Sequence, residues 1–321
     1  MKIEECYGKE YSFIDVRSPK EFAEDHIPEA INIPLFSNEE RAIVGTLYKQ
    51  VGKDVAIERG LEIVGEKLAE MMKDYSSYKG KKLCVYCWRG GMRSGSVVSL
   101  LQNLNYDVVQ LENGYKDYRR FVREQLETVA IPPLVILYGL TGSGKTEILE
   151  KLHNSIDLEG LAQHRGSIFG DIGKTVRSQK RFESLLLQRL LELQKEKMVF
   201  IEGESRKIGQ TMIPLRLWTL MQQAQKGKVM CSTEERVERL YKDYCTGMDK
   251  ELIIQKITLI EKYLGKRKAE ELISLLEQNK VKEVIQDILL DYYDVLYKHT
   301  VDSKVYSFTI HDEKDLQKLF T

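Results

Sequence analysis

The segment Gly139–Thr146, which reads Gly-Leu-Thr-Gly-Ser-Gly-Lys-Thr, constrains the fold more than any other part of the chain. It matches the phosphate-binding pattern G-x-x-x-x-G-K-[ST], which requires a strand before it and a helix after it. An apolar run at Leu134–Tyr138 and a helical pattern at Glu147–His153 supply both elements. A chance glycine-rich turn would not bring this context, so the sequence predicts an α/β domain built on a parallel sheet.

The chemistry of this loop follows from its residue types. Its backbone amides can surround phosphate groups, the Lys145 ammonium can reach a terminal phosphate, and the Thr146 hydroxyl can bind Mg²⁺. ATP or GTP is the general ligand of such a loop, and any other diphosphate would fit it equally well. The predicted phosphate-binding residues are Gly139, Thr141, Gly142, Ser143, Gly144, Lys145 and Thr146.

An acidic stretch follows the apolar strand predicted at Met198–Glu202. In phosphate-loop domains a magnesium-binding Asp often stands at this place, but this chain has Glu202 and Glu204 instead. Both carboxylates are candidates to bind a metal ion, here Mg²⁺, or the ligand itself. The alternative interpretation is a solvated strand end.

A second α/β pattern comes first in the chain. Strand-like runs at Tyr11–Val16, Lys82–Cys87 and Asp107–Leu111 alternate with helical patterns. The helical pattern at Glu58–Met72 gathers four residues on one apolar face, namely Leu61, Val64, Leu68 and Met71. A charged helix at Tyr115–Glu127 is then broken by Ile131-Pro-Pro133, so we predict domains at residues 1–128 and 132–321.

The second domain is predicted to continue its sheet after the strand at Met198–Glu202. Further strands are expected at Lys228–Cys231 and Val305–Ile310, and the stretch from Thr233 to about His299 is almost wholly helical in pattern. The predicted fold class is therefore α/β throughout, with two parallel-sheet domains and a helical C-terminal region.

Composition excludes several classes of protein. The 321 residues carry a formal net charge of zero, which removes the simplest argument for nucleic-acid binding, a strongly basic domain, but does not exclude a local basic face. No apolar run approaches the roughly 18 residues of a membrane span. The first residues, Met1–Ser12, lack the apolar core of a signal peptide, so we expect a cytoplasmic protein without a membrane partner. The five cysteines show no framework spacing, which argues against a disulfide scaffold.

The loop after the strand at Lys82–Cys87 has the features of an anion-binding site with a nucleophile. Paired glycines allow a tight loop whose amides converge, and the following helix adds positive potential. Arg93 can bind an oxyanion with two hydrogen bonds. The same field should lower the pKa of Cys87 and make it a nucleophile for sulfur, selenium or phosphorus. The predicted loop residues around Cys87 are Trp88, Arg89, Gly90, Gly91, Arg93 and Ser94.

The alternative for Cys87 is a structural cysteine at a strand end, but its arginine and glycine neighbours argue against that. Cys84 lies three residues before Cys87, which places the two on opposite faces of a strand, so Cys84 is predicted to be a core residue and not a redox partner. The remaining cysteines, Cys6, Cys231 and Cys245, carry no motif and are predicted to be structural. No spacing for a zinc site is present.

Three segments of the first domain resemble the rhodanese family. They are Phe13-Ile-Asp-Val-Arg-Ser-Pro19, Glu21-Phe22 and His26-Ile-Pro-Glu-Ala-Ile-Asn-Ile-Pro34, with Cys87 in the place of the persulfide-carrying cysteine. Most sulfurtransferases of this family place the loop arginine five positions after the cysteine, whereas Arg93 follows Cys87 by six. The longer spacing resembles rhodanese-related dual-specificity phosphatases and arsenate reductases, which implies room for a phosphate-sized anion.

Nearly the whole chain resembles the tRNA 2-selenouridine synthase family, most weakly beyond Thr233. Beyond the two loops, the resemblance rests on Asp157-Leu-Glu-Gly-Leu-Ala-Gln-His-Arg-Gly-Ser-Ile-Phe-Gly170, Phe182-Glu183 and Ile201-Glu-Gly-Glu-Ser-Arg-Lys-Ile-Gly209. It implies a transferase acting on 2-thiouridine at the wobble position of tRNA. In that family the sulfur is geranylated from geranyl diphosphate, and the S-geranyl group is then replaced by selenium from selenophosphate. These are substrates, and no tightly bound cofactor is expected.

A tRNA partner requires basic groups near the site, and several lie in glycine-flanked loops of the second domain. The predicted tRNA contacts are His164, Arg165, Arg177, Arg181, Arg206 and Lys207, each with a solvated surface residue as its alternative. Two other functions stay open. One is an ATP-coupled sulfurtransferase of rhodanese type. The other is a cysteine phosphatase fused to a kinase-like domain, for which Asp25 or His26 would be the general acid.

Overall fold

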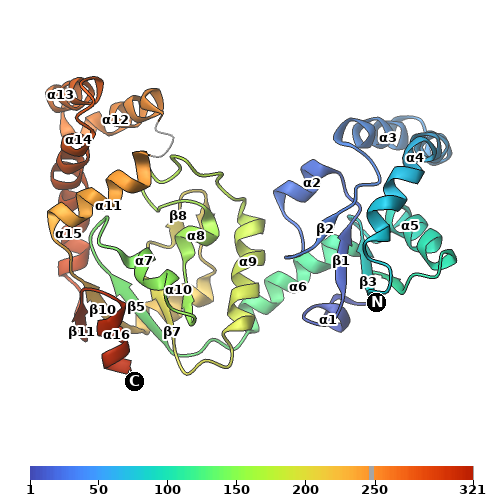
Figure 1. Cartoon of the computed structure of the whole chain (residues 1–321), viewed down its shortest axis with the longest axis horizontal. Helices are drawn as coiled ribbons and strands as arrows, with labels where there is room; N and C mark the ends of the chain where they lie inside the picture. The colour runs from blue at the N-terminus through green and yellow to red at the C-terminus, as the bar shows by residue number, and fades with distance from the viewer. Residues whose placement is uncertain (246–248, 321) are drawn as a thin grey trace. The chain divides into compact units, whose positions relative to one another are not determined.

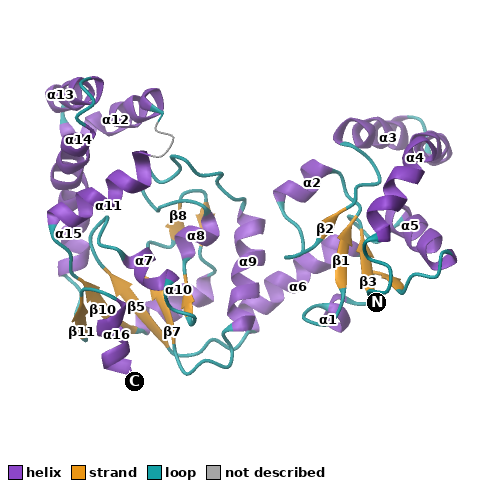
Figure 2. Ribbon diagram, in the orientation of Figure 1, coloured by secondary structure: helices purple, strands orange, loops and turns teal. Residues whose placement is uncertain are grey.

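The structure is a computed structural model that describes residues 1–245 and 249–320. The chain divides into two compact units. One comprises Met1–Thr128 and Glu183–Gln188, and the other comprises Val129–Phe182 and Arg189–Thr321. Helices and strands alternate in both (Figure 1, Figure 2), which confirms the predicted α/β class. Within the described ranges, no helix is both long and apolar enough to span a bilayer.

The first unit is built on a parallel sheet with the strand order β2-β1-β3-β4. Its strands are β1 (Ser12–Asp15), β2 (Ile31–Asn32), β3 (Leu83–Tyr86) and β4 (Val108–Gln110). Its helices are α1 (Ile3–Cys6), α2 (Pro19–Glu24), α3 (Asn38–Gln50), α4 (Lys53–Ser76), α5 (Met92–Asn103) and α6 (Gly114–Thr128). The three strands expected from the sequence, at Tyr11–Val16, Lys82–Cys87 and Asp107–Leu111, are confirmed as β1, β3 and β4.

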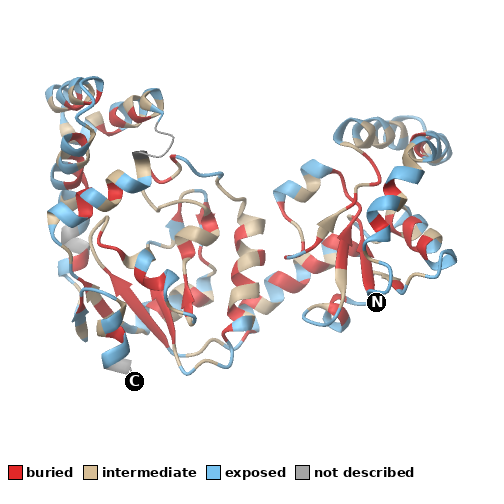
Figure 3. Cartoon of the chain, in the orientation of Figure 1, coloured by how far each residue is buried: buried red, intermediate tan, exposed pale blue. Residues whose placement is uncertain are grey.

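The sheet of this unit is covered by apolar side chains, and Figure 3 shows β1 and β3 as buried. The predicted apolar face of α4 is only partly a core face. Met71 is buried, and Val64 and Leu68 pack against the core from its edge, but Leu61 is 67% exposed. The helix instead turns Ala56, Gly60, Ile63, Met71 and Tyr75 inward. The helix carries two apolar stripes, so its sequence pattern alone does not show which of them faces the core.

A buried ion pair joins the end of β1 to the rest of the first unit. The Arg17 guanidinium contacts Asp15 at 2.6 Å, with 1% and 0% of the two side chains exposed. It also donates a hydrogen bond of 2.7 Å to the Asp25 carbonyl and lies 3.8 Å from the ring centre of Tyr115. A buried charge of this kind is tolerated only with such partners.

The second unit contains a parallel sheet with the order β11-β10-β5-β7-β6 and an antiparallel pair of strands, β8 and β9. Its strands are β5 (Leu134–Tyr138), β6 (Ser155–Ile156), β7 (Val199–Glu202), β8 (Lys207–Ile208), β9 (Thr211–Met212), β10 (Gln225–Val229) and β11 (Phe308–Ile310). The first helices are α7 (Lys145–Glu150), α8 (Leu158–Ala162), α9 (Gln179–Glu192) and α10 (Leu215–Gln223). The strands expected at Met198–Glu202 and Val305–Ile310 are confirmed. The strand expected at Lys228–Cys231 begins earlier, at Gln225, because the edge of β5 pairs with the polar residues before Val229.

The C-terminal part is helical, as predicted. It contains α11 (Thr233–Cys245), α12 (Lys250–Leu264), α13 (Lys266–Glu277), α14 (Val281–Ile288), a π-helical turn at Leu289–Tyr293, α15 (Asp294–Asp302) and, after β11, α16 (Glu313–Phe320). Helices α11 to α14 lie together to one side of the sheet (Figure 1). Their core is separate from that of the sheet and includes Ile257, Ile260 and Leu272, each completely buried.

The Arg17 ion pair gives a test of what holds the first unit together. Arg17→Ala should destabilise the unit by about 3–5 kcal/mol, because it leaves Asp15 buried without its partner. Chemical denaturation of the full chain would measure the loss. Arg59→Ala is the control, since Arg59 pairs with Glu62 on the surface and should cost under about 1 kcal/mol. Equal effects of the two changes would contradict the assigned role.

Candidate functional site

Each unit places one reactive loop at the carboxyl end of a strand near the middle of its sheet. In the first unit the chain leaves β1 toward β2 on one side and returns as β3 on the other, so β1 and β3 flank a switch point. In the second unit β5 occupies the same kind of position between β7 and β10. Ligands of open α/β sheets bind in the crevice at such points. Cys87 follows β3, and Gly139 follows β5.

The loop after β3 curls tightly around Cys87. Gly90 has a φ of +61°, and a Cβ there would lie 2.7 Å from the Leu111 carbonyl oxygen, so the position requires glycine. The amide of Tyr115 donates a hydrogen bond of 2.8 Å to the Cys87 carbonyl, which ties the loop to α6. The backbone shape of the loop is therefore set by contacts with neighbouring segments of the same unit.

The Cys87 side chain is 3% exposed and lies beside a hydroxyl donor. Ser94 Oγ is 3.2 Å from Cys87 Sγ, and the Gln110 side-chain amide in turn donates to Ser94 Oγ at 2.9 Å. Burial raises the pKa of the Cys87 thiol, but the hydrogen bonds from Ser94, the charge of Arg93 and a backbone hydrogen bond from Arg89 together outweigh it. The net effect is a lowered pKa, which favours the nucleophilic thiolate.

The loop arginine is held in place by an acidic residue of α2. Arg93 donates to Glu21 at 3.0 Å, with 18% and 22% of the two side chains exposed. Burial raises the pKa of Glu21, but the charge and hydrogen bond of Arg93, a backbone hydrogen bond from Ser18 and the charge of Arg41 together lower it below its usual value. The predicted loop residues Trp88 and Arg89 also lie here, and the Trp88 ring is tilted against Tyr115 at 5.3 Å. The geometry thus brings together the anion-loop residues that the sequence predicted.

The other cysteines have separate environments. Cys84 is completely buried, and its Sγ lies 3.8 Å from the Sγ of buried Cys6, so the prediction of a core residue is confirmed. Cys231 is half-buried beside Glu235 and Arg239. The side chain of Cys245 lies outside what the structure describes. Asp25, weighed as a general acid, is completely buried and accepts a 2.8 Å hydrogen bond from the Tyr115 hydroxyl.

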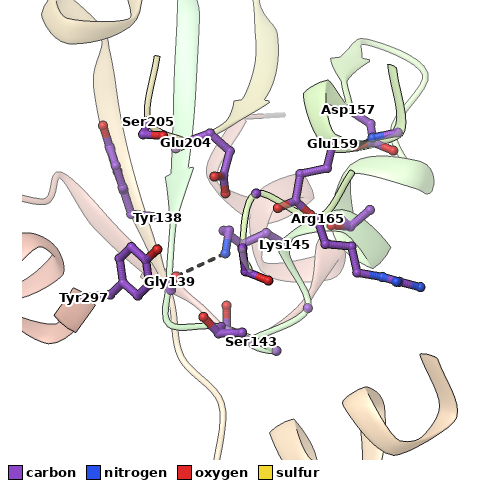
Figure 4. Close-up of a pocket in the computed structure, with 18 of the residues that line it drawn as sticks. Tyr138, Gly139, Ser143, Lys145, Asp157, Glu159, Arg165, Glu204, Ser205 and Tyr297 are labelled. Carbon is purple, nitrogen blue, oxygen red and sulfur yellow. Dashed lines mark hydrogen bonds between the residues drawn. The ribbon is translucent and has the colours of Figure 1, made fainter. Parts of the chain in front are cut away.

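The phosphate loop opens into a cavity of about 700 Å³ (Figure 4). Gly144 precedes α7 with a φ of +92°, a conformation that favours glycine. Lys145 Nζ donates a hydrogen bond of 3.1 Å to the Gly139 carbonyl, across the loop. All of the predicted phosphate-binding residues, from Gly139 to Thr146, line this cavity.

Carboxylates gather opposite Lys145. Glu202 is completely buried at the end of β7 and accepts a 2.7 Å hydrogen bond from the Glu159 amide, so the alternative of a solvated strand end is wrong. Burial, followed by the charge of Glu204, raises the pKa of Glu159 to about 8. Burial also raises the pKa values of Glu202, Glu204 and Asp157. Figure 4 shows Glu159 and Glu204 on the side of the cavity that faces Lys145.

Aromatic side chains form another part of the cavity wall. Tyr138 ends β5, Trp218 belongs to α10, Tyr244 to α11 and Tyr297 to α15, and all four line the cavity. Figure 4 draws Tyr138 and Tyr297 on the same side of the cavity as Gly139. A wall of this type can hold the apolar part of a ligand whose phosphates lie in the loop. These residues carry no sequence motif that would identify them, because they come from four separate elements.

Two arginines of α11 support the phosphate loop and were also missed. Arg236 donates to the Thr141 carbonyl at 2.8 Å and pairs with Asp294 at 2.6 Å. Arg239 donates to the Gly142 carbonyl at 2.6 Å. The two arginines are three residues apart, which puts both on one helix face, and this spacing was the only sign in the sequence that they act together.

The predicted tRNA contacts are dispersed. Arg165 donates to the Ile172 carbonyl and stacks on Tyr244, Arg177 donates to the Gly160 carbonyl, and Arg206 donates to the Ile213 carbonyl. These guanidinium groups therefore spend some of their hydrogen-bond donors on backbone carbonyls of the same unit. His164 and exposed Lys207 line a separate polar cavity of about 380 Å³, together with Lys256. Arg181 lies at the start of α9, where its amide is capped by Ser178.

Among the residues that the structure describes, no group of three or more His, Cys, Asp or Glu side chains has the arrangement of a metal site. The carboxylates near Lys145 are therefore not a preformed cage.

Comparison with known proteins covers both units. The family model described as tRNA 2-selenouridine synthase AAA domain matches residues 132–319, and the rhodanese-like domain model matches residues 4–120. A tRNA 2-selenouridine synthase of Photobacterium profundum is 34% identical over 91% of this chain and 89% of its own length. The corresponding protein of Pseudomonas syringae pv. syringae (strain B728a) is 35% identical over 91% of this chain and 88% of its own. A solved N-terminal domain from Clostridium difficile 630, from a candidate ATP/GTP binding protein, is 47% identical over 38% of this chain and 97% of that chain, with a TM-score of 0.34.

The environment of Cys87 predicts how its reactivity depends on pH. Ser94→Ala should raise the pKa of Cys87, because it removes a hydrogen bond that stabilises the thiolate. The pH dependence of the iodoacetamide alkylation rate at Cys87, read by peptide mass spectrometry, would measure it. Ser96→Ala is the matched control, since the Ser96 hydroxyl donates only to the Arg93 carbonyl. An unchanged midpoint in Ser94→Ala would contradict the proposed stabilisation.

The carboxylates predict a second pH dependence. Below about pH 8 Glu159 is protonated and neutral, and above it the carboxylate adds a negative charge to the phosphate site. Affinity for inorganic diphosphate should therefore fall as the pH rises through about 8 in the wild type. Glu159→Gln, which stays neutral, should make the profile flatter. Calorimetry on the two proteins at several pH values tests this, and identical profiles would refute it.

Proposed function

Because the chain belongs to the tRNA 2-selenouridine synthase family, we propose that it converts 2-thiouridine at the wobble position of tRNA to 2-selenouridine by way of S-geranyl-2-thiouridine. Geranyl diphosphate and selenophosphate are the proposed donors. The chain is an enzyme of the transferase type, as its relatives are. The observation that carries the finer proposal is the presence of two anion-binding loops, each with its reactive side chain at the carboxyl end of a strand.

The geranyl step is assigned to the phosphate loop. The sulfur of 2-thiouridine attacks the first carbon of the geranyl chain, the C–O bond to diphosphate breaks, and N3 of the base releases its proton to the solvent. The loop amides and the Lys145 ammonium stabilise the negative charge of the departing diphosphate. The aromatic wall formed by Tyr138, Trp218, Tyr244 and Tyr297 supports a prenyl ligand, because it gives the apolar chain a surface in the same cavity.

The selenium step is assigned to the Cys87 loop. The Cys87 thiolate attacks the phosphorus of selenophosphate, so that an S–P bond forms and the Se–P bond breaks. The released selenide adds to C2 of the base and displaces geranylthiolate, which takes up a proton. Water then hydrolyses the phosphocysteine to phosphate and restores the thiol.

This sequence of substitutions balances without an oxidant or a reductant. A selenium atom carried as a Cys–S–Se adduct would need a reductant to release it, so attack at phosphorus is the simpler chemistry. The six-residue spacing from Cys87 to Arg93 favours it, since that spacing accommodates a phosphate-sized anion. Arg93, held by Glu21, is placed to bind phosphoryl oxygens with its remaining donors.

Magnesium is a proposed participant at the phosphate loop. The Thr146 hydroxyl and the Glu204 carboxylate, which both line the cavity, are the groups of this chain that would hold it. Mg²⁺ would neutralise diphosphate charge there and would favour ionised carboxylates.

Contact with tRNA is proposed for the polar cavity lined by His164 and by exposed Lys207. Lys256 also lines this cavity, where it is paired with Asp171 at 2.8 Å. Arg165, Arg177, Arg181 and Arg206 are proposed to support this region, mostly by fixing the loops that present it.

The division of labour between the loops is tested by the nucleoside at which each variant stops. Cys87→Ser should accumulate S-geranyl-2-thiouridine, because the selenium donor is not activated. Lys145→Ala should leave 2-thiouridine, because it removes a charged contact to diphosphate worth about 1.5–3 kcal/mol. Mass spectrometry of tRNA nucleosides from complemented deletion cells gives the readout.

Two matched controls lie outside the loops. Cys84→Ala changes a buried core cysteine and should cost stability and not chemistry, and Lys151→Ala changes an exposed lysine that pairs with Glu313. Both should support 2-selenouridine formation. Accumulation of 2-thiouridine in Cys87→Ser and in Lys145→Ala alike would contradict separate steps. Sulfur exchange without any selenouridine, or phosphate release from phosphoproteins, would favour the sulfurtransferase or the phosphatase instead.

A further inference from the structure

An apolar groove of about 710 Å³ lies against the Cys87 loop within the first unit. One wall is the loop and the start of α5, including Gly90, Gly91, Met92 and Arg93. The facing wall comes from α3 and α4 and from the segment that contains Leu35 and Phe36. The volume falls in the range of about 300–1,000 Å³ that is usual for small-molecule sites.

The α4 wall is a continuous helical stripe. Ile57, Leu61, Val64 and Leu68 follow one another at intervals of four, three and four residues, and all line the groove. Leu61, Val64 and Leu68 belong to the apolar face that the sequence pattern predicted, which only partly faces the core. Leu61 is 67% exposed, Met92 is 51% exposed and Tyr48 is 53% exposed, although all three are large and apolar. Exposed apolar side chains that gather in one concave site usually mark a binding surface.

The groove and the Cys87 side chain share one buried apolar cluster. Cys87 does not line the groove, but it belongs to the same buried cluster as Leu35, Phe36 and Val97, which do. An apolar ligand in the groove would therefore lie against the loop that holds the nucleophile. The ligand must carry its apolar part close to the atom that reacts.

We propose that this groove binds the prenyl chain of the S-geranylated nucleoside while selenium replaces sulfur at Cys87. The inference rests on the proposed function, because it takes the S-geranyl base as the substrate of the selenium step. In that substrate the chain begins at the sulfur bonded to the reacting carbon. A surface for the chain must then start at the reactive loop, and this groove does so at Gly90, Gly91 and Met92.

The proposal predicts chain-length selectivity in the selenium step. Anticodon stem-loop RNAs would carry S-methyl-, S-dimethylallyl- or S-geranyl-2-thiouridine at the wobble position, with selenophosphate supplied. The wild-type protein should prefer geranyl to methyl by about 100-fold or more in kcat/KM, because the pocket recognises the added carbons. The three leaving groups are all alkyl thiolates, so the comparison reports mainly on the chain.

Leu61→Glu places a charge in the groove. Because Leu61 is 67% exposed, the charged side chain can stay in water and the fold should be kept. The change should lower the preference for geranyl over dimethylallyl, and over methyl, by about tenfold or more. Val55→Glu is the matched control, since Val55 is a 42% exposed apolar residue of the same helix that does not line the groove. The control should keep the wild-type preference, and thermal melts should show both variants folded.

A binding measurement separates this inference from the proposed function. Without selenophosphate, the wild type should bind the geranylated stem-loop more tightly than the 2-thiouridine stem-loop, and Leu61→Glu should reduce that difference. If the wild type binds the geranyl group selectively but never forms selenouridine, the proposed function fails and the groove remains supported. If Leu61→Glu and Val55→Glu both retain the wild-type selectivity in binding and turnover, the groove is not the prenyl site.

Discussion

The burial of charge is the constraint on which both reactive loops depend. In the first unit the Arg17 guanidinium is sealed between Asp15, the Asp25 carbonyl and the Tyr115 ring. Tyr115 in turn donates its amide to the Cys87 carbonyl, so the same buried cation helps to fix the loop that carries the nucleophile. A charge without such partners would cost several kcal/mol, so this geometry leaves little freedom for the loop to change shape.

The second unit buries acidic groups, whereas the first buries a cation. Glu159 and Glu204 lie near Lys145, and buried Glu202 accepts a hydrogen bond from the Glu159 amide; burial raises the pKa values of all three. A raised pKa favours the neutral form of a carboxyl group, which repels an anionic ligand less than a carboxylate does. Acidic side chains near the phosphate loop therefore oppose a bound diphosphate less than solvated carboxylates would. Arg236 and Arg239 fix the loop carbonyls, which leaves the loop amides free to face the ligand.

The sequence predicted the two loops well because each motif constrains its own backbone. The glycines and the Lys-Thr pair define a strand–loop–helix turn within a few residues, and the loop from Cys87 to Ser94 does the same. Features that depend on distant segments were not predictable in this way. The burial of Glu202 results from Asp157 and Glu159 packing over the end of β7, and the aromatic wall is assembled from β5, α10, α11 and α15. The exposure of Leu61 has the same origin, since helical periodicity identifies an apolar stripe but not what lies opposite it.

Both loops adjoin an apolar surface, and this pairing suggests why a prenyl group would be used at all. Displacement at C2 of a base requires the reacting carbon to be held close to the selenium donor, and binding energy from a remote part of the substrate can be used for that purpose. A thiocarbonyl sulfur offers almost no surface for binding and is a poor leaving group. Alkylation changes both properties in one step, because the sulfur becomes a thiolate leaving group and gains a long apolar chain. Under the proposed function, the aromatic wall at the phosphate loop and the groove beside Cys87 would be two surfaces for the same chain, before and after its transfer to the base.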